Sequence, residues 1–275
     1  MNFLDFIKNI YKKYYQDEVP SMSAQTSFFV ILSFIPFLIY ILTVISNLNL
    51  PEQNVYIYLQ SILPQDTYQS IVGIIEEILS RNDVSVYSIL FTLYFASKGS
   101  KGIIVALNKA YNEREHRNII VLIIMSLLFT VIVAFLLAIA LIALVFGRQI
   151  SEKLFQTIYL QSHFIIIWEY LRHLLTIFFM LIIFTIIYKH APSCKLAIKD
   201  VIPGSLFTTF SWTLVSGIFA YYMNNFNTSY ASLYGSLSGI FALLIWLYIS
   251  STIIILGGEI NAYILKNKKN KKWYR

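Results

Sequence analysis

The sequence has little charge and almost no cysteine. Only 13% of its 275 residues are charged, whereas 57% are hydrophobic, and the mean hydropathy is +0.66. Soluble domains carry roughly 25% charged residues and have no room to bury so much apolar surface. These proportions exclude a soluble globular protein. The single cysteine, Cys194, also excludes a disulfide within the chain.

The sequence also lacks the signatures of common enzymes. Its four histidines form no HExxH pattern, and neither a GxxxxGK[ST] phosphate loop nor a GxSxG motif occurs. The carboxylates are not clustered as a metal-dependent nuclease requires. We therefore predict no enzyme, no metal ion and no cofactor. The net charge of +7 comes from residues between apolar runs, which indicates membrane topology rather than a nucleic-acid partner.

Long apolar stretches predict the fold class, an all-α polytopic membrane protein with six transmembrane helices in a single membrane domain over residues 1–275. Residues 1–20 predict an interfacial amphipathic helix with Lys8, Lys12 and Lys13 near the lipid headgroups. The polar stretch after the first span, within 53–79, predicts short amphipathic helices on the extracytoplasmic face. The six predicted spans are 24–46, 84–111 with an internal break, 119–146, 168–188, 201–223 and 234–264.

The distribution of positive charge sets the predicted orientation. Of the 21 Lys and Arg residues, 17 fall on one side of the six spans, including the tail 265–275. The positive-inside rule places that side in the cytoplasm, so both termini are predicted to be cytoplasmic and the tail to be a basic cytoplasmic segment. We expect this face to contact membrane lipids, including anionic headgroups.

Ionisable and amide side chains within the spans are the candidate functional residues. The apolar part of the second span, 84–96, reaches only ~20 Å, so we expect the helix to break at SKGSKG, residues 97–102. Lysines there either extend to the headgroups or line a polar cavity.

Glu259 is either an interfacial packing residue or linked to substrate or ions. We expect Lys98 or Lys101 to pair with Glu259. The substrate- or ion-linked candidates are Lys98, Lys101, Asn108, Glu259 and Asn261.

Glycine and proline positions predict where helices bend or pack closely. Small residues let two helix backbones approach each other, and proline removes a backbone hydrogen bond. Asp200 is expected at a helix N-terminus. The predicted helix-packing residues are Pro36, Gly99, Pro203, Gly204, Tyr234, Gly235, Gly239, Gly257 and Gly258.

In this order, the motifs resemble the YihY/BrkB family of bacterial inner-membrane proteins, formerly misnamed ribonuclease BN. The resemblance covers about residues 20–265. It rests on SAQTSFFVILSFIPFLI, FASKGSKGIIVALNKAYN, DVIPGSLFTT and, most specifically, SYASLYGSLSGIFALLIWLYISSTIIILGGEINA. The family tends to have Arg where this chain has Lys98 and Lys101. Lysine keeps the charge but loses the bidentate geometry of arginine.

The resemblance implies a multi-pass protein of the bacterial cell (cytoplasmic) membrane with six spans and cytoplasmic termini, and it supplies no reaction. Our functional hypothesis is a transporter or flippase-like exporter of an amphipathic or lipid-related substrate, without nucleotide hydrolysis. The alternative is a structural or scaffolding protein of the cell envelope that does not transport. The ribonuclease interpretation finds no support in these residues.

Overall fold

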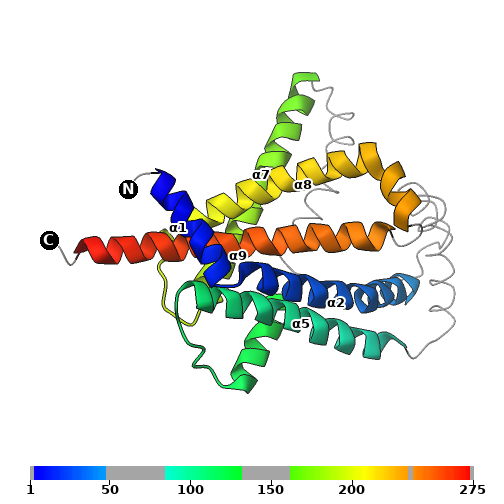
Figure 1. The fold of residues 1–275 in the computed structure, drawn as a ribbon. Coiled ribbons are helices and arrows are strands. Elements are labelled where there is room, and N and C mark those ends of the chain that lie inside the picture. The colour runs from blue at the N-terminus through cyan, green and yellow to red at the C-terminus, as the bar shows by residue number, and fades with distance from the viewer. Residues whose placement is uncertain (1–2, 48–83, 132–161, 235–237, 273–275) are drawn as a thin grey trace.

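The computed structural model describes residues 3–47, 84–131, 162–234 and 238–272, and within these ranges every regular element is a helix (Figure 1). The all-α prediction is therefore confirmed. The predicted outer helices within 53–79 and the second half of the third span lie outside the described residues. The helices are α1 (Phe3–Gln16), α2 (Val19–Asn47), α5 (Val84–Ala110), the segment Ile119–Val131, α7 (Ser162–His190), α8 (Ile198–Tyr234) and α9 (Ser238–Lys272).

Three of these helices contain stretches that are long and apolar enough to cross a bilayer: Leu90–Ala110, Ile198–Met223 and Phe241–Lys268. Ile119–Val131 and Leu174–His190 are shorter apolar helices. The outer surfaces of the helices are apolar, with Phe210 71% and Leu174 63% exposed. Such surfaces suit hydrocarbon rather than water. The chain is thus a polytopic helical membrane protein, and the number of six spans stays a prediction.

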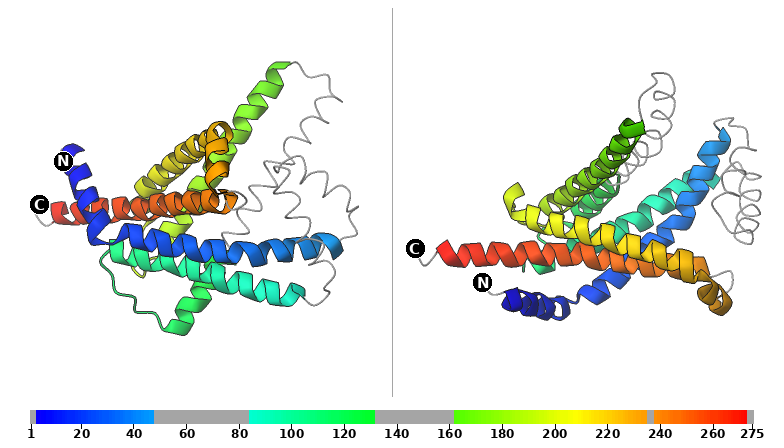
Figure 2. Two further views of the ribbon diagram at one scale, coloured as in Figure 1. Left: turned by 45° about the vertical axis from the view of Figure 1, so that its right-hand side comes forward. Right: turned by 90° about the horizontal axis from the view of Figure 1, so that it is seen from above.

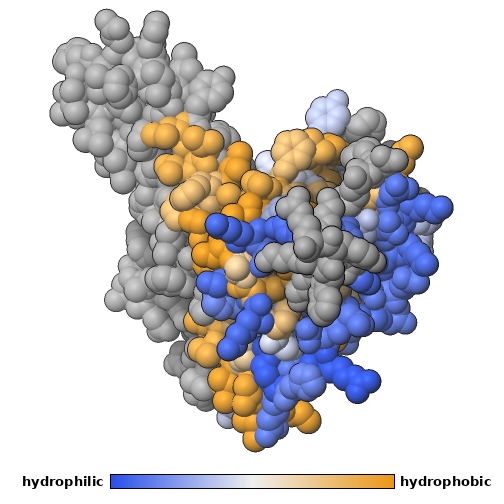
Figure 3. Space-filling model, turned by 90° about the vertical axis from the view of Figure 1, so that its left-hand side faces the viewer, coloured by the Kyte–Doolittle hydropathy of each residue, from blue (hydrophilic) through white to orange (hydrophobic). Residues whose placement is uncertain are grey.

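The central layer is formed by α2, α5, α8 and α9, which pack along one another, while α7 crosses α8 obliquely (Figures 1 and 2). The short helix α1 lies across the C-terminal half of α9, and both described termini are at the same end of the bundle. Figure 3 shows hydrophilic residues gathered over that end. We call it the basic end; it includes Lys13, Lys109, Arg117, Lys189, Lys195 and Lys268.

The predicted break in the second span is wrong. α5 is one helix of 27 residues that runs through 97–102. Its glycines allow close packing on α2: a Cβ on Gly99 would lie 2.9 Å from Val30 Cγ2, and one on Gly102 would lie 2.6 Å from Thr26 Oγ1. A helical glycine costs about 1 kcal/mol relative to alanine. The contact with α2 offsets that cost, so the helix continues.

Local capping fixes the helix ends at the basic end. α5 stops at a Schellman motif: Asn112 has φ 56°, its N–H donates to Lys109 O, and the N–H of Glu113 donates to Asn108 O. At the start of α8, the Asp200 carboxylate accepts a hydrogen bond from the N–H of Ala197, which confirms the predicted role of Asp200.

The predicted boundaries of the last two spans also need correction. The polar stretch after Met223 is helical, so α8 extends to Tyr234, which ends this helix instead of beginning the next. Gly235 lies outside the described residues, and Gly239 is the second residue of α9. α2 passes through Pro36 as one helix. The side chains around Pro36, Tyr234 and Gly239 are likewise outside the described part, so their predicted packing roles stay predictions.

Candidate functional site

A buried ion pair joins α1 to α9 at the basic end. Lys13 Nζ lies 2.7 Å from Glu259 Oε2, 3.2 Å from Asp17 Oδ2 and 3.0 Å from Ala110 O at the end of α5. The Glu259 side chain is fully buried, and that of Lys13 is 23% exposed. A charge removed from water needs such a partner. Lys13 therefore ties three helices together instead of extending to the lipid headgroups as predicted.

Helix α1 presents different side chains to α9 and to its surroundings. Phe6 makes an edge-on contact with Tyr263, with ring centroids 5.5 Å apart, and the Asn9 side-chain amide donates to the Tyr263 hydroxyl. A separate stripe at helical spacing is exposed and apolar or aromatic. It comprises Leu4, Ile7, Tyr11 and Tyr15. An exposed stripe of this kind suits the membrane interface, so the interfacial role of residues 1–20 stays a prediction, whereas the other face of α1 packs on α9.

The two glycines before Glu259 allow three helices to meet on α9. Gly257 faces α8 and α7, where a Cβ would overlap Thr208 Oγ1 and the Tyr188 hydroxyl. Gly258 faces α5, where a Cβ would overlap Leu107 Cδ2. On the opposing helix, a Cβ on Gly204 would overlap the carbonyl oxygen of Gly257. The backbones of α8 and α9 are thus in direct contact, as small residues permit.

Hydrogen bonds hold the α8–α9 contact in register. Asn261 Oδ1 accepts a 2.6 Å hydrogen bond from the N–H of Gly204, one residue after Pro203. On α7, the Tyr188 hydroxyl donates to Ile254 O at 2.6 Å and lies 2.6 Å from Thr208 Oγ1. Buried polar groups require such partners. Tyr188 is fully buried and therefore links α7, α8 and α9 at one point.

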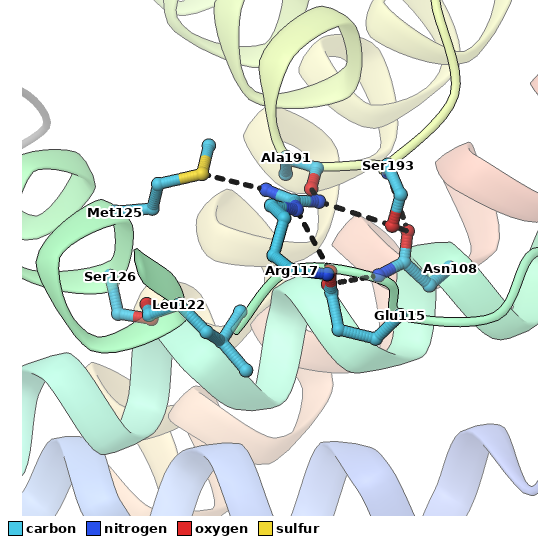
Figure 4. A network of polar contacts seen from close by, with 8 residues as sticks. All are labelled: Asn108, Glu115, Arg117, Leu122, Met125, Ser126, Ala191 and Ser193. Carbon is cyan, nitrogen blue, oxygen red and sulfur yellow. Dashed lines mark hydrogen bonds and ion pairs between the residues drawn. The ribbon is translucent and has the colours of Figure 1, made fainter. Parts of the chain in front are cut away.

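A second polar network joins the loop after α5 to the loop between α7 and α8 (Figure 4). The buried Asn108 donates to Glu115 Oε2 and accepts from the N–H and hydroxyl of Ser193. The Arg117 guanidinium donates to Glu115 Oε1 at 2.9 Å, to Ala191 O at 2.9 Å and to the Ser193 hydroxyl at 3.2 Å. It also contacts Met125 Sδ. The network gives the two loops one fixed arrangement.

Some buried polar atoms near the ion pair lack a partner. Within the described part of the chain, Glu259 Oε1, Asn261 Nδ2 and the Tyr111 hydroxyl are buried and make no hydrogen bond. An unsatisfied buried polar group is costly, and an ionisable one inside a membrane segment, such as Glu259, is by default a candidate functional residue. These atoms can therefore still form hydrogen bonds at the point where α5, α8 and α9 meet near the basic end.

The predicted pairing of Lys98 or Lys101 with Glu259 is wrong. Glu259 pairs with Lys13, and neither of the two α5 lysines forms an ion pair with it. Lys98 Nζ instead lies over the Tyr94 ring, 5.2 Å from its centroid. With α5 unbroken, Lys98 is 12 residues and ~18 Å from the end of the helix at Ala110. The two lysines are therefore separated from Glu259 along the helix axis.

The sequence identified Asn108, Glu259 and Asn261, but it missed Lys13, Arg117 and Tyr188. Lys13 lies in a helix whose charge pattern is typical of headgroup contact, so nothing local distinguishes it from Lys8 or Lys12. Tyr188 occurs in an apolar run, where a hydroxyl is the only signal of a buried hydrogen bond. Arg117 follows Glu115 by two residues, and this short spacing is the one local sign of the loop network.

Comparison with known proteins identifies relatives over the whole chain. A family model described as "Virulence factor BrkB" matches residues 10–274. The "Putative ribonuclease-like protein YfkH" of Bacillus subtilis is 34% identical over 268 residues, 97% of each chain. A UPF0761 membrane protein of Pseudoalteromonas translucida is 35% identical over 81 residues, 30% of this chain and 27% of that protein. No solved structure matches significantly.

Proposed function

This chain belongs to the BrkB family of membrane proteins, and from that premise we propose that it is a transporter or flippase-like exporter of an amphipathic or lipid-related substrate. We place it in the bacterial cell (cytoplasmic) membrane as a multi-pass protein. Transport is proposed to proceed without nucleotide hydrolysis, because the sequence carries no phosphate-binding loop. The word "ribonuclease-like" is part of the name of the Bacillus relative and is not carried over to this chain. We propose that this chain is not an enzyme.

The observation that carries the proposal is the buried pair of Lys13 and Glu259. An ionisable residue inside a membrane segment is costly and is by default a candidate for a substrate or ion pathway. Here the carboxylate lies on a candidate span, its Oε1 has no partner among the described residues, and its counter-ion is supplied by the interfacial helix α1. In the proposed cycle, α1 closes the basic end while the pair is intact. Loss of the pair frees α1 to move.

A second candidate function is favoured by a different observation. The backbones of α8 and α9 touch at Gly204 and Gly257, and Tyr188 fastens α7 to both. Contacts of this kind suit a rigid bundle. A scaffolding protein of the cell envelope that does not transport needs only such packing. A scaffolding role gives no reason to retain a buried carboxylate with an unpartnered oxygen.

The proposal is tested by lipid translocation in proteoliposomes. Vesicles containing the purified protein and fluorescent phosphatidylethanolamine or phosphatidylglycerol are treated with a membrane-impermeant quencher. We expect quenching beyond the outer-leaflet fraction, and we expect Glu259→Gln to change the rate at least about fivefold. Lys8→Gln, an exposed change on the same helix α1, serves as the control. The scaffold would be favoured by two results together. With both probes, the vesicles would show the same quenching as protein-free vesicles, and a deletion strain would have an unchanged lipid composition.

A further inference from the structure

A pocket with a volume of about 380 Å³ opens at the basic end beside the loop network. It lies where the loop after α5 meets the loop between α7 and α8. We call it the basic pocket. Its lining includes Arg117, Lys189, His190, Lys195, Met125 and Leu196. The first four are basic and the last two are apolar, so the pocket joins positive charge to a hydrophobic edge.

The positive charge of the basic pocket is only partly compensated. Glu115 accepts from the Arg117 guanidinium at 2.9 Å and neutralises it. Lys189 and Lys195 make no ion pair with any described residue, and no carboxylate is among the described lining residues. Two lysine charges are therefore left for an anion. Lysine acts on phosphate as a point charge with three donors, which suits a ligand of variable geometry.

The walls of the basic pocket are fixed before any ligand arrives. Arg117 is held at once by Glu115, Ala191 and Ser193, and Ser193 is held in turn by Asn108 (Figure 4). Asn108 is 3% exposed and belongs to α5, so the network anchors the two loops to an apolar helix. A preformed wall lowers the ordering cost of binding.

The basic pocket lies beside the ends of two apolar helices. The apolar stretch Leu174–His190 ends with Lys189 and His190, and the apolar segment Ile119–Val131 begins two residues after Arg117. Close to the pocket in the chain, Ile119 is 68% exposed, Ile120 is 64% exposed and Ile198 is 51% exposed. These side chains suit acyl chains, whereas the lysines suit headgroups. A ligand in the pocket would therefore span both environments.

We propose that the basic pocket binds the phosphate group of an anionic lipid. Lys189 and Lys195 supply the charge, and Met125 and Leu196 contact the glycerol and the first acyl carbons. Basic pockets between membrane helices on the cytoplasmic side are suited to headgroups of this kind. The inference is independent of the proposed function, because a lipid held here serves a scaffold as well as a transporter.

Cys194 allows a test on the unaltered protein. It also lines the pocket and is the one cysteine of the chain, so a neutral maleimide reports on occupancy without any substitution. In nanodiscs of phosphatidylglycerol mixed with phosphatidylcholine, we expect labelling at least about fivefold slower than in pure phosphatidylcholine. In the control, Cys194→Ser is combined with Lys8→Cys, which moves the labelled thiol to an exposed position on α1. Its labelling rates in the two kinds of nanodisc should be equal. Equal rates at Cys194 in both lipids would overturn the proposal.

A variant pair then ties the protection to the two lysines. In Lys189→Gln/Lys195→Gln, the slowing by phosphatidylglycerol should disappear, whereas Lys8→Gln/Lys12→Gln removes the same charge from α1 and should retain it. If both pairs lose the protection equally, general attraction to the surface explains it and the pocket is not a site. Should the first pair fail to fold, the wild-type labelling result decides alone.

Inorganic phosphate distinguishes the two sources of the ligand. In pure phosphatidylcholine nanodiscs, millimolar phosphate should leave the labelling rate of Cys194 unchanged, because a free anion lacks the acyl contact with Met125 and Leu196. Protection by phosphate alone, with none by phosphatidylglycerol, would overturn the assignment to a lipid and identify a soluble phosphorylated ligand.

Discussion

The ammonium of Lys13 on α1 lies 2.7 Å from Oε2 of Glu259 on α9, although 246 residues separate them in the chain. The two partners differ in their surroundings. Lys13 also contacts Asp17 and is partly exposed, whereas Glu259 is fully buried and Lys13 is its one ion-pair partner among the described residues. Removing Lys13 and removing Glu259 should therefore change the stability of the protein by different amounts.

Lys13→Met should destabilise the protein more than Glu259→Gln. The first change strands a buried carboxylate and should cost about 3 kcal/mol, the lower end of the range for breaking buried pairs. The second leaves Lys13 with Asp17 and should cost about 1 kcal/mol. Unfolding in mixed micelles measures both. In a double-mutant cycle the combined change should cost less than the sum, whereas additive costs would mean that the pair is not coupled.

Gly204→Ala should be strongly destabilising and Gly217→Ala should not. A Cβ on Gly204 would overlap the carbonyl oxygen of Gly257, so α8 has to move away from α9, which costs about 1–3 kcal/mol or more. Gly217 is on the same helix with nothing within 4 Å of its Cβ position, so alanine there should be neutral or stabilise by up to about 1 kcal/mol. Unfolding midpoints in one detergent compare the two. Equal midpoints would contradict the close backbone contact.

Tyr188→Phe should loosen the junction of α7, α8 and α9. The change removes hydrogen bonds to Ile254 O and Thr208 Oγ1 but keeps the ring in place, so we expect a loss of about 1–2 kcal/mol. Hydrogen exchange should increase for amides on α9 around Ile254. Unchanged exchange and stability would show that the hydroxyl is not needed to hold α7.

Stability should fall at acidic pH through Glu18, which lies outside the membrane segments. The Lys109 ammonium, 2.6 Å from Glu18 Oε2, lowers the pKa of that carboxyl below its ordinary 4.5. A lowered folded-state pKa gives a contribution that is complete above about pH 4.5 and is lost as the pH falls toward the folded-state value. The pair is exposed, so the effect should be small.

The comparison is with Glu18→Gln, which cannot titrate. Between pH 6 and about pH 3, the melting temperature of the wild type should fall slightly more than that of the variant. Parallel curves would show that the Glu18–Lys109 pair contributes nothing measurable.

The orientation and the number of spans are tested by accessibility. Reporter fusions after Asn118 and Lys195 should report cytoplasm, because both positions lie at the basic end, and a fusion at Gln69 should report the outside. One reversed site would contradict the six-span topology.

The sequence was sufficient to predict the helices, but not to predict which helices pack against each other. Apolar length and the positive-inside pattern predicted helical spans, and Asp200 was recognised as a cap because capping is local. The break at 97–102 is predicted because the apolar run 84–96 is too short to cross a bilayer, yet α5 continues there and Gly99 and Gly102 pack on Thr26 and Val30 from another helix. The length of an apolar run contains no information on the helices that pack beside it.

In the candidate site, too, individual residues were predictable from the sequence but their partners were not. Glu259, Asn261 and Asn108 were identified because polar groups in apolar segments are rare. Their partners, Lys13, Gly204 and Ser193, are distant in the chain and were not predictable from spacing. The sequence predicts Lys98 or Lys101 as the partner of Glu259 from their depth, the cost of an unpaired charge and the neighbouring glycines, but the unbroken α5 places both lysines too far along the helix axis.

The contact between α1 and α9 also sets an order of events during biosynthesis. α1 is synthesised before α9, and Glu259, which pairs with Lys13, is added 246 residues later. At 5–20 residues per second, α1 waits roughly 12–50 s for its partner. During that interval, its exposed stripe of Leu4, Ile7, Tyr11 and Tyr15 can hold it on the membrane surface. The contact of α1 with α9 therefore forms only after α9 has been synthesised, and a chain truncated before α9 leaves Lys13 without its carboxylate.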